Sequence, residues 1–184
     1  LKQIWTQSKD INSDNLQEMI YDFETEISNI IPWSVERPYL YDLQISLSSF
    51  DNKEIEATNY KIGFTKIEKK SNAILFNGKT LKIKGVARHE HHPINACIVD
   101  KPWMDNDVDL MKLNNINAVK NYHPVNDYWY SITKKYGLFL FESPNITDYK
   151  LTNHSPVNDS IIYQNYLFRI KNMYERHKNH PNII

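Results

Sequence analysis

The chain has 184 residues, with 22 Lys and Arg balanced by 22 Asp and Glu, and 41% of its residues are hydrophobic. This length allows one domain or two small ones, and the even charge lacks the basic excess of a nucleic-acid-binding surface. No apolar run is long enough for a bilayer and the N-terminus has no secretory pattern, so we expect a cytoplasmic protein with no nucleic-acid or membrane partner. The single Cys97 excludes an internal disulfide and is expected to pack as a small hydrophobe.

The first half of the chain carries antiparallel β patterns. Residues 1–32 are weakly patterned and are expected to be irregular or at the edge of a sandwich. Apolar residues then alternate with polar ones from Tyr41 to Leu47, which is the period of a half-buried strand. The Asn77-Gly78 pair predicts a hairpin turn, because both residues tolerate positive φ. The predicted strands are 41–47, 54–64, 73–76 and 81–86.

In the second half, helix and strand patterns alternate. Asp105 can cap a helix that turns Val108, Met111 and Leu110 inward, and Gly137 can end a second helix in the left-handed conformation. The third helix, behind an Asn158-Asp159 cap, has an apolar stripe that is expected to be core. That stripe comprises Tyr163, Tyr166, Leu167, Ile170, Met173, Tyr174 and His177.

These elements are predicted in the order helix from 105, strand 116–119, helix 127–136, strand 138–141 and helix 160–177. Strands that alternate with helices imply parallel pairing and right-handed crossovers. The pattern is typical of the first part of a (β/α)₈ barrel.

The densest polar run is Arg88-His89-Glu90-His91-His92-Pro93, at the end of an apolar strand-like segment. Three interpretations are open. The run can be a surface histidine cluster, or a zinc site, since His89 and His91 would share one face of a strand. It can also bind a polar ligand at the carboxyl end of a strand.

The run from Asn77 through Pro93, including GVARHEHHP, resembles the start of the barrel in family 2 β-galactosidases. The β-glucuronidase branch resembles it less, because its loop carries acidic and small residues after the His-Glu pair. Further similar segments follow and precede it in the family's order: 33–34, 38–41, 62–64, 107–121, 129–130, 136–138 and 179–181. The resemblance implies terminal strands of an immunoglobulin-like β-sandwich over 1–67 and the N-terminal part of a TIM-barrel catalytic domain over 68–184.

Active sites of such barrels lie at the carboxyl ends of the strands. By resemblance, His89 and His123 match positions that hydrogen-bond a galactosyl group and support its transition state. Arg88 and Glu90 complete the candidate sugar-binding set. His123 can also be a loop residue with no ligand, and Glu90 can simply orient a neighbour or cap backbone, as can Glu142.

No catalytic residue is expected within the 184 residues. Retaining glycosidases need an acid/base and a nucleophile about 5 to 5.5 Å apart. In the resembling family the acid/base Glu follows a Trp-Ser-Leu-Gly-Asn run just beyond the position of Ile184, and the nucleophile lies further on. We therefore expect a truncated chain that is inactive alone.

Two further segments depart from the family. Thr147 and Tyr149 stand where the family has the Glu and His of its magnesium site, so we predict no metal cofactor. Around Lys120 to Pro124 one residue is missing, Lys replaces Arg, and a bulky Tyr122 has entered. The missing residue is expected to turn the His123 ring in another direction. A Lys ammonium also cannot bind two acceptors at once, as the Arg guanidinium of the family can.

Two hypotheses follow. The chain is part of a glycoside hydrolase acting on terminal β-galactosides of the lactose type, active only with the remainder of the barrel or a second subunit. Alternatively it is a non-catalytic carbohydrate-binding or interaction module, with a zinc site of His89, His91, His92 and His123 as a distant third. Unpaired strand edges of a part-barrel predict poor solubility or oligomerisation of the isolated chain.

Overall fold

The computed structural model describes residues 3–11, 20–146 and 160–184. The chain divides into two compact units, 1–31 and 32–184. The described part of the first unit contains no helix or strand, as its weak patterning predicted. Within the described ranges, none of the helices combines the length and hydropathy that spanning a membrane requires.

Strands β1 (Tyr41–Ser48) and β2 (Glu54–Ile62) form an antiparallel hairpin, with Tyr41 opposite Ile62. The two strands were predicted from apolar alternation, and this prediction is confirmed. Burial is less than predicted at the far end of the hairpin, where Ile45 and Leu47 remain exposed.

A second antiparallel sheet contains β3 (Ile67–Lys70), β4 (Ala73–Phe76) and β5 (Lys79–Thr80). The predicted Asn77-Gly78 turn is confirmed, with φ of 49° and 78°. The predicted strand 81–86 is wrong, because β5 ends at Thr80 and the next strand begins at Gly85. The side chain of Asn117 forms hydrogen bonds with the backbone between these two strands. Its Oδ1 accepts from Lys84 N at 2.7 Å, and its Nδ2 donates to Lys82 O at 2.8 Å.

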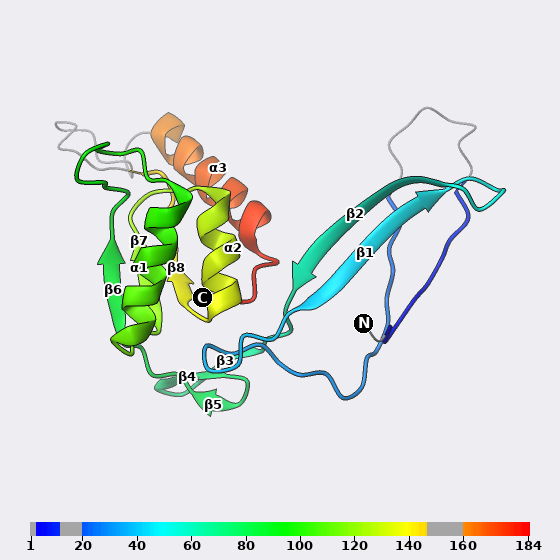
Figure 1. Ribbon diagram of the computed structural model, residues 1–184, viewed down its shortest axis with the longest axis horizontal. Coiled ribbons are helices and arrows are strands. Elements are labelled where there is room, and N and C mark those ends of the chain that lie inside the picture. The colour runs from blue at the N-terminus through cyan, green and yellow to red at the C-terminus, as the bar shows by residue number, and fades with distance from the viewer. Residues whose placement is uncertain (1–2, 12–19, 147–159) are drawn as a thin grey trace. The chain divides into compact units, whose positions relative to one another are not determined.

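The third sheet is parallel, in the order β6 (Gly85–Arg88), β7 (Ala118–Asn121) and β8 (Phe139–Phe141). Helices α1 (Lys101–Leu113) and α2 (Asp127–Tyr136) connect these strands, as Figure 1 shows. The strand-helix alternation predicted from sequence is therefore confirmed as the first part of a barrel. One buried cluster joins the sheet to both helices: Met104, Val108, Val119, Trp129, Tyr130, Ile132, Leu138 and Leu140.

The ends of the first two helices follow local capping rules. The α1 N-cap is Asp100, whose carboxylate accepts from Trp103 N at 3.0 Å, so the predicted Asp105 cap is wrong. Pro102 in the first turn tolerates the missing N–H there. The inward position of Val108 is confirmed, whereas Leu110 is exposed. Helix α2 ends at Gly137, at φ 79°, as predicted.

Helix α3 (Ser160–His177) has the predicted bounds, but its stripe is not a core. His177 is buried and Tyr166 and Met173 are half-buried, whereas four stripe residues are exposed: Tyr163, Leu167, Ile170 and Tyr174. After this helix the chain returns to the parallel sheet, where Ile183 forms an isolated parallel bridge with Leu140. The predicted Asn158-Asp159 cap lies outside the described residues.

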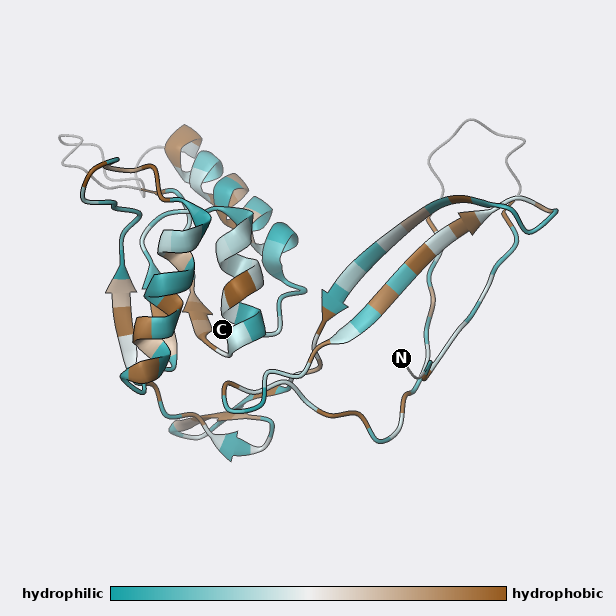
Figure 2. Ribbon diagram, in the orientation of Figure 1, coloured by the Kyte–Doolittle hydropathy of each residue, from teal (hydrophilic) through white to brown (hydrophobic). Residues whose placement is uncertain are grey.

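Cys97 was expected to be packed and is instead an exposed free thiol. It lies in the loop between β6 and α1, where Ile94 and Ile98 are also exposed. Hydropathy colouring in Figure 2 shows β6 as hydrophobic over most of its length and hydrophilic at its carboxyl end, where Arg88 lies.

Candidate functional site

The carboxyl ends of the three parallel strands meet at one edge of the sheet. The register pairs Arg88 of β6 with Asn121 of β7, so the loops that begin at His89 and Tyr122 start side by side. Glu142 follows β8 at the same edge. The sequence predicted that these loops converge on one rim, and the register confirms it.

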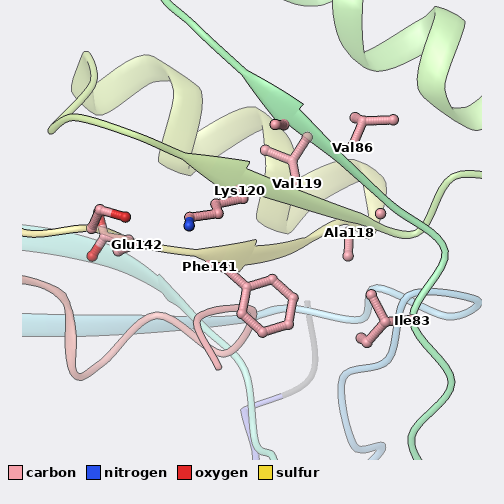
Figure 3. A pocket seen from close by; sticks show the side chains of 10 residues that line it. Ile83, Val86, Ala118, Val119, Lys120, Phe141 and Glu142 are labelled. Carbon is pink, nitrogen blue, oxygen red and sulfur yellow. The ribbon is translucent and has the colours of Figure 1, made fainter.

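An open groove of about 500 Å³ runs over one face of the parallel sheet, as Figure 3 shows. Small residues of β6 and β7 line its middle, and Lys120, Phe141 and Glu142 also line it. Its remaining lining residues are Ile83, Gly85, Val86, Ala87, Ala118, Val119 and Ser143. The four predicted sugar-binding residues do not line this groove, whereas Glu142 does.

Arg88 is buried and reaches the helix layer. Its Nε donates to Asp107 Oδ2 on α1 at 2.8 Å, and its Cζ lies 4.0 Å from the centroid of the Trp129 ring on α2. The strand was expected to end near Val86 but continues to Arg88, which places Arg88 on the same face of the strand as Val86. These contacts make Arg88 a structural link between sheet and helices, and its contact with a sugar stays a prediction.

Glu90 is half-buried and forms an ion pair with Arg88 Nη1. Its carboxylate thus balances the charge that Asp107 alone would have to balance. The expectation that Glu90 orients a neighbour agrees with this contact.

His89 and His123 are both exposed at the rim. The imidazole of His89 stacks on the ring of Tyr122, with centroids 4.4 Å apart and planes 6° from parallel. Of the predicted sugar-binding set, these two histidines are the ones with side chains open to solvent at the strand ends.

His92 has a structural part in the loop after β6. Its Nδ1 accepts from Ile94 N at 3.1 Å and from Asn95 N at 3.0 Å, and its ring packs edge-on against Trp103 at 4.5 Å. Among the described residues no three His, Cys, Asp or Glu side chains are grouped as a metal site would require. The zinc arrangement considered from sequence is therefore not formed.

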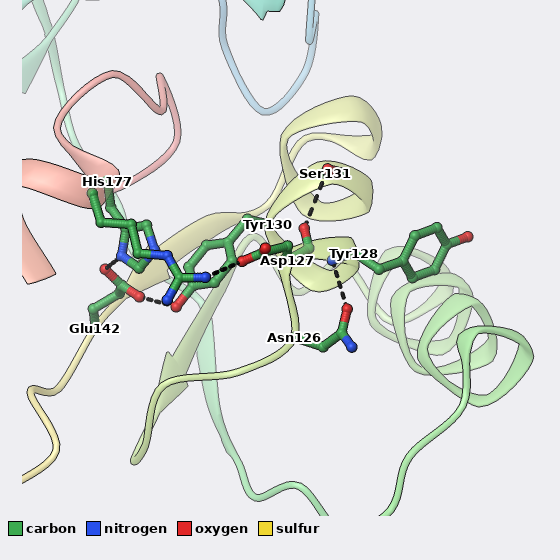
Figure 4. A network of polar contacts seen from close by, with 8 residues as sticks. Asn126, Asp127, Tyr128, Tyr130, Ser131, Glu142 and His177 are labelled. Carbon is green, nitrogen blue, oxygen red and sulfur yellow. Dashed lines mark hydrogen bonds and ion pairs between the residues drawn. The ribbon is translucent and has the colours of Figure 1, made fainter.

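Behind the rim, Glu142 joins a buried network that the sequence did not predict, drawn in Figure 4. Tyr130 OH donates to Glu142 Oε1, and His177 Nδ1 lies 2.7 Å from Glu142 Oε2. Burial, followed by the hydrogen bond to Glu142, raises the pKa of Tyr130 well above its ordinary value. Both carboxylate oxygens are thus engaged in holding α2, β8 and α3 together.

His180 packs beside this network, with its ring centroid 5.8 Å from that of His177. Burial is the main cause that lowers the pKa of His180 to about 4, and Lys134 and His177 add to it. A neutral His180 is therefore part of the folded state near neutral pH.

Thr147 and Tyr149, the predicted departures from the family's magnesium segment, lie outside the described residues. Of the nearby acids, Glu142 is fully paired with Tyr130 and His177. The absence of a metal cofactor stays a prediction from sequence.

A β-hairpin followed by parallel strands and helices, with histidines at the carboxyl edge, defines a barrel protein whose site lies at that edge. Two family models match this chain: the one described as "Glycosyl hydrolases family 2, TIM barrel domain" over residues 66–184, and the one described as "Glycosyl hydrolases family 2" over 1–64. The chain therefore belongs to glycosyl hydrolases family 2.

Curated relatives carry the name beta-galactosidase. The chain is 38% identical over 154 residues to one from Pectobacterium atrosepticum, covering 83% of this chain and 15% of the relative. It is 35% identical over 165 residues to one from Alteromonas mediterranea, covering 88% of this chain and 16% of the relative. The chain thus spans about one sixth of the length of these relatives.

Solved structures agree on the fold. The Lactobacillus rhamnosus β-glucuronidase has a TM-score of 0.76 and 26% identity, covering 85% of this chain and 27% of that one. The sandwich tail followed by the start of a TIM barrel, expected from the sequence, is thereby confirmed.

Proposed function

We propose that residues 1–184 are part of a β-galactosidase-like glycoside hydrolase that acts on terminal β-galactosides of the lactose type. The observation that carries this proposal is the 35–38% identity to curated beta-galactosidases across 83–88% of the chain. The GVARHEHHP run, on which the resemblance was drawn, lies at the rim where barrel enzymes bind substrate.

In this proposal His89 and His123 donate hydrogen bonds to sugar hydroxyls as positive charge develops on the sugar ring. Their exposure at the ends of β6 and β7 leaves their ring nitrogens accessible to a ligand. Arg88 and Glu90 support this loop from behind through their ion pair.

The polypeptide of residues 1–184 is proposed to be inactive by itself. Hydrolysis needs a proton donor and an attacking carboxylate. Glu90 is paired with Arg88, and Glu142 is paired with Tyr130 and His177, so neither rim carboxylate is free for that work. The remainder of a barrel, covalently joined or as a second subunit, would supply both groups.

The test is an assay of a polypeptide in which residues 1–184 are continued by the remainder of a family 2 barrel, with chromogenic β-galactoside, β-glucoside and β-glucuronide. We expect the galactoside to have the highest kcat/KM, and the His89→Gln variant to lower it by about 100-fold or more, the scale of a lost transition-state donor. The matched control is His91→Gln, an exposed neighbour two residues away, which should stay within threefold. A preference for the glucuronide would contradict the proposal.

One observation favours the alternative of a non-catalytic carbohydrate-binding module. In the part of the chain that the structure describes, the carboxylates of Glu90 and Glu142 form internal pairs, whereas His89 and His123 are exposed. If galactose raises the melting temperature of a complete barrel that hydrolyses none of the three substrates, the binding module is the better description.

A further inference from the structure

Tyr122 covers a face of the imidazole of His89. The two ring planes are 6° from parallel with centroids 4.4 Å apart, so the rings overlap face to face. Tyr122 is itself 39% exposed, which places the pair at the surface of the rim. A stacked ring restricts rotation of its neighbour while the nitrogens at the imidazole edge stay accessible.

The strand register explains how the pair forms. Arg88 and Asn121 are opposite each other at the ends of β6 and β7, and the next residue on each strand is a member of the stack. The stack therefore joins the first two loops of the barrel rim. Insertion or deletion of one residue in either strand would shift the register and remove this alignment.

Within the described ranges, the stack with Tyr122 is the ring contact that His89 makes. Among the described residues no hydrogen bond or ion pair to its ring is formed, in contrast to His92, whose Nδ1 accepts two backbone N–H groups. A group that donates to a transition state must be held to within a fraction of an ångström. The aromatic contact with Tyr122 is the one that can hold it.

Lys120 extends the stack along β7. Its Nζ lies 4.9 Å from the centroid of the Tyr122 ring, within the range of a cation–π contact. Lys120 also borders the groove over the sheet, visible in Figure 3. The contact of Lys120 with Tyr122 and the stack of Tyr122 on His89 thus connect the groove to the rim.

We propose that Tyr122 is a positioning residue that sets the ring plane of His89 for sugar binding. This inference rests on the proposed function. In the resembling β-galactosidases this segment carries Arg and small residues, so Tyr122 gives this chain its own means of orienting the histidine. Tyr122 acts through His89 and not through its hydroxyl.

The experiment is a double-mutant cycle in a polypeptide in which residues 1–184 are continued by the remainder of a family 2 barrel, assayed with a chromogenic β-galactoside. We expect Tyr122→Leu to lower kcat/KM about tenfold, mostly through kcat, and Tyr122→Phe to stay within twofold because the ring is kept. In the His89→Gln background, Tyr122→Leu should cost less than twofold, because the residue it positions is gone.

A matched control is Tyr136→Leu. Tyr136 is an exposed tyrosine with Lys135 Nζ 5.0 Å from its ring, and no imidazole from the described part of the chain stacks on it. This variant should leave kcat/KM within twofold. An equal loss from Tyr122→Leu with and without His89, or a loss below twofold in the parent, would overturn the proposal.

A second readout separates this inference from the proposed function. The ring-proton NMR signals of His89, assigned by their loss in His89→Gln, should move downfield in Tyr122→Leu and stay in place in Tyr122→Phe. If no β-galactoside is hydrolysed, the proposed function fails, and these signals alone then decide whether Tyr122 orients His89. Unmoved signals in Tyr122→Leu would refute the positioning role.

Discussion

Asp107 on α1 accepts a hydrogen bond at 2.8 Å from Nε of Arg88, a residue at the end of β6 with a side chain 6% exposed. The contact ties the first strand of the parallel sheet to the helix that follows it. It also turns the guanidinium away from solvent and over Trp129. The rim loop that starts at His89 is therefore anchored by Arg88, the residue directly before it.

Removing this anchor should destabilise the barrel portion. Asp107→Asn leaves the buried Arg88 with Glu90 as its remaining ionic partner and is expected to lower the free energy of unfolding by about 2–4 kcal/mol. The matched control is Asp109→Asn, an exposed carboxylate on the same helix, which should change it by under about 0.5 kcal/mol. Urea unfolding followed by circular dichroism measures both, and equal values would refute the anchoring role.

Two glycines at nearly the same positive φ should respond differently to alanine. Gly137 has φ 79°, and a Cβ there would collide with the backbone carbonyl of Val35. Gly78 has φ 78° with nothing within 4 Å of its Cβ position. Gly78→Ala is expected to cost about 1 kcal/mol, the left-handed penalty, and Gly137→Ala about 3 kcal/mol or more. A comparable melting-temperature loss in both variants would contradict the close approach of Val35.

Protonation of His180 should make the folded state less stable at low pH. Its pKa is lowered from 6.5 to about 4 by burial, so between these values the unfolded chain binds a proton that the folded chain does not. Stability is therefore highest above pH 6.5 and falls as the pH decreases toward 4. Allowing for partial exposure, the loss is about 1–2 kcal/mol.

The check is a comparison of chemical unfolding at pH 7 and pH 5 for the parent and for His180→Phe, which cannot titrate. The parent should lose more stability over this interval than the variant does. A larger loss in the variant would show that His180 is not held neutral in the folded state.

The isolated polypeptide of residues 1–184 should self-associate. Phe50 is 96% exposed, and Ile161 and Phe168 on α3 are 80% and 64% exposed. Apolar surface of this kind favours association in water. Sedimentation velocity is expected to show concentration-dependent oligomers, and a single monomeric species with a sharp cooperative melt would contradict this expectation.

Local signals predicted the elements well where the stabilising contacts are themselves local. The bounds of α2 could be predicted because the left-handed Gly137 lies within the element's own sequence. The strand 81–86 was wrong because its hydrogen bonds go to the side chain of Asn117, more than thirty residues away. Periodicity carries no information about such a partner.

In the candidate site, too, features set by local sequence could be predicted and those set by distant partners could not. The sequence predicted that His89 and His123 lie at the rim, since strand ends follow from the pattern. It did not predict the Tyr130, Glu142 and His177 network, because these residues come from three elements that meet only in the folded chain. The burial of Arg88 was missed because β6 continues two residues beyond the predicted end.

We propose that this family 2 chain carries sugar-binding histidines at the rim, and that the groups that cleave the glycosidic bond come from the remainder of the barrel. The most direct measurement is lactose hydrolysis by purified polypeptide 1–184, before and after a polypeptide with the remainder of the barrel is added. We predict no glucose release by the first alone and release after the addition, lost again with His89→Gln. Glucose release by residues 1–184 unaided would contradict the account.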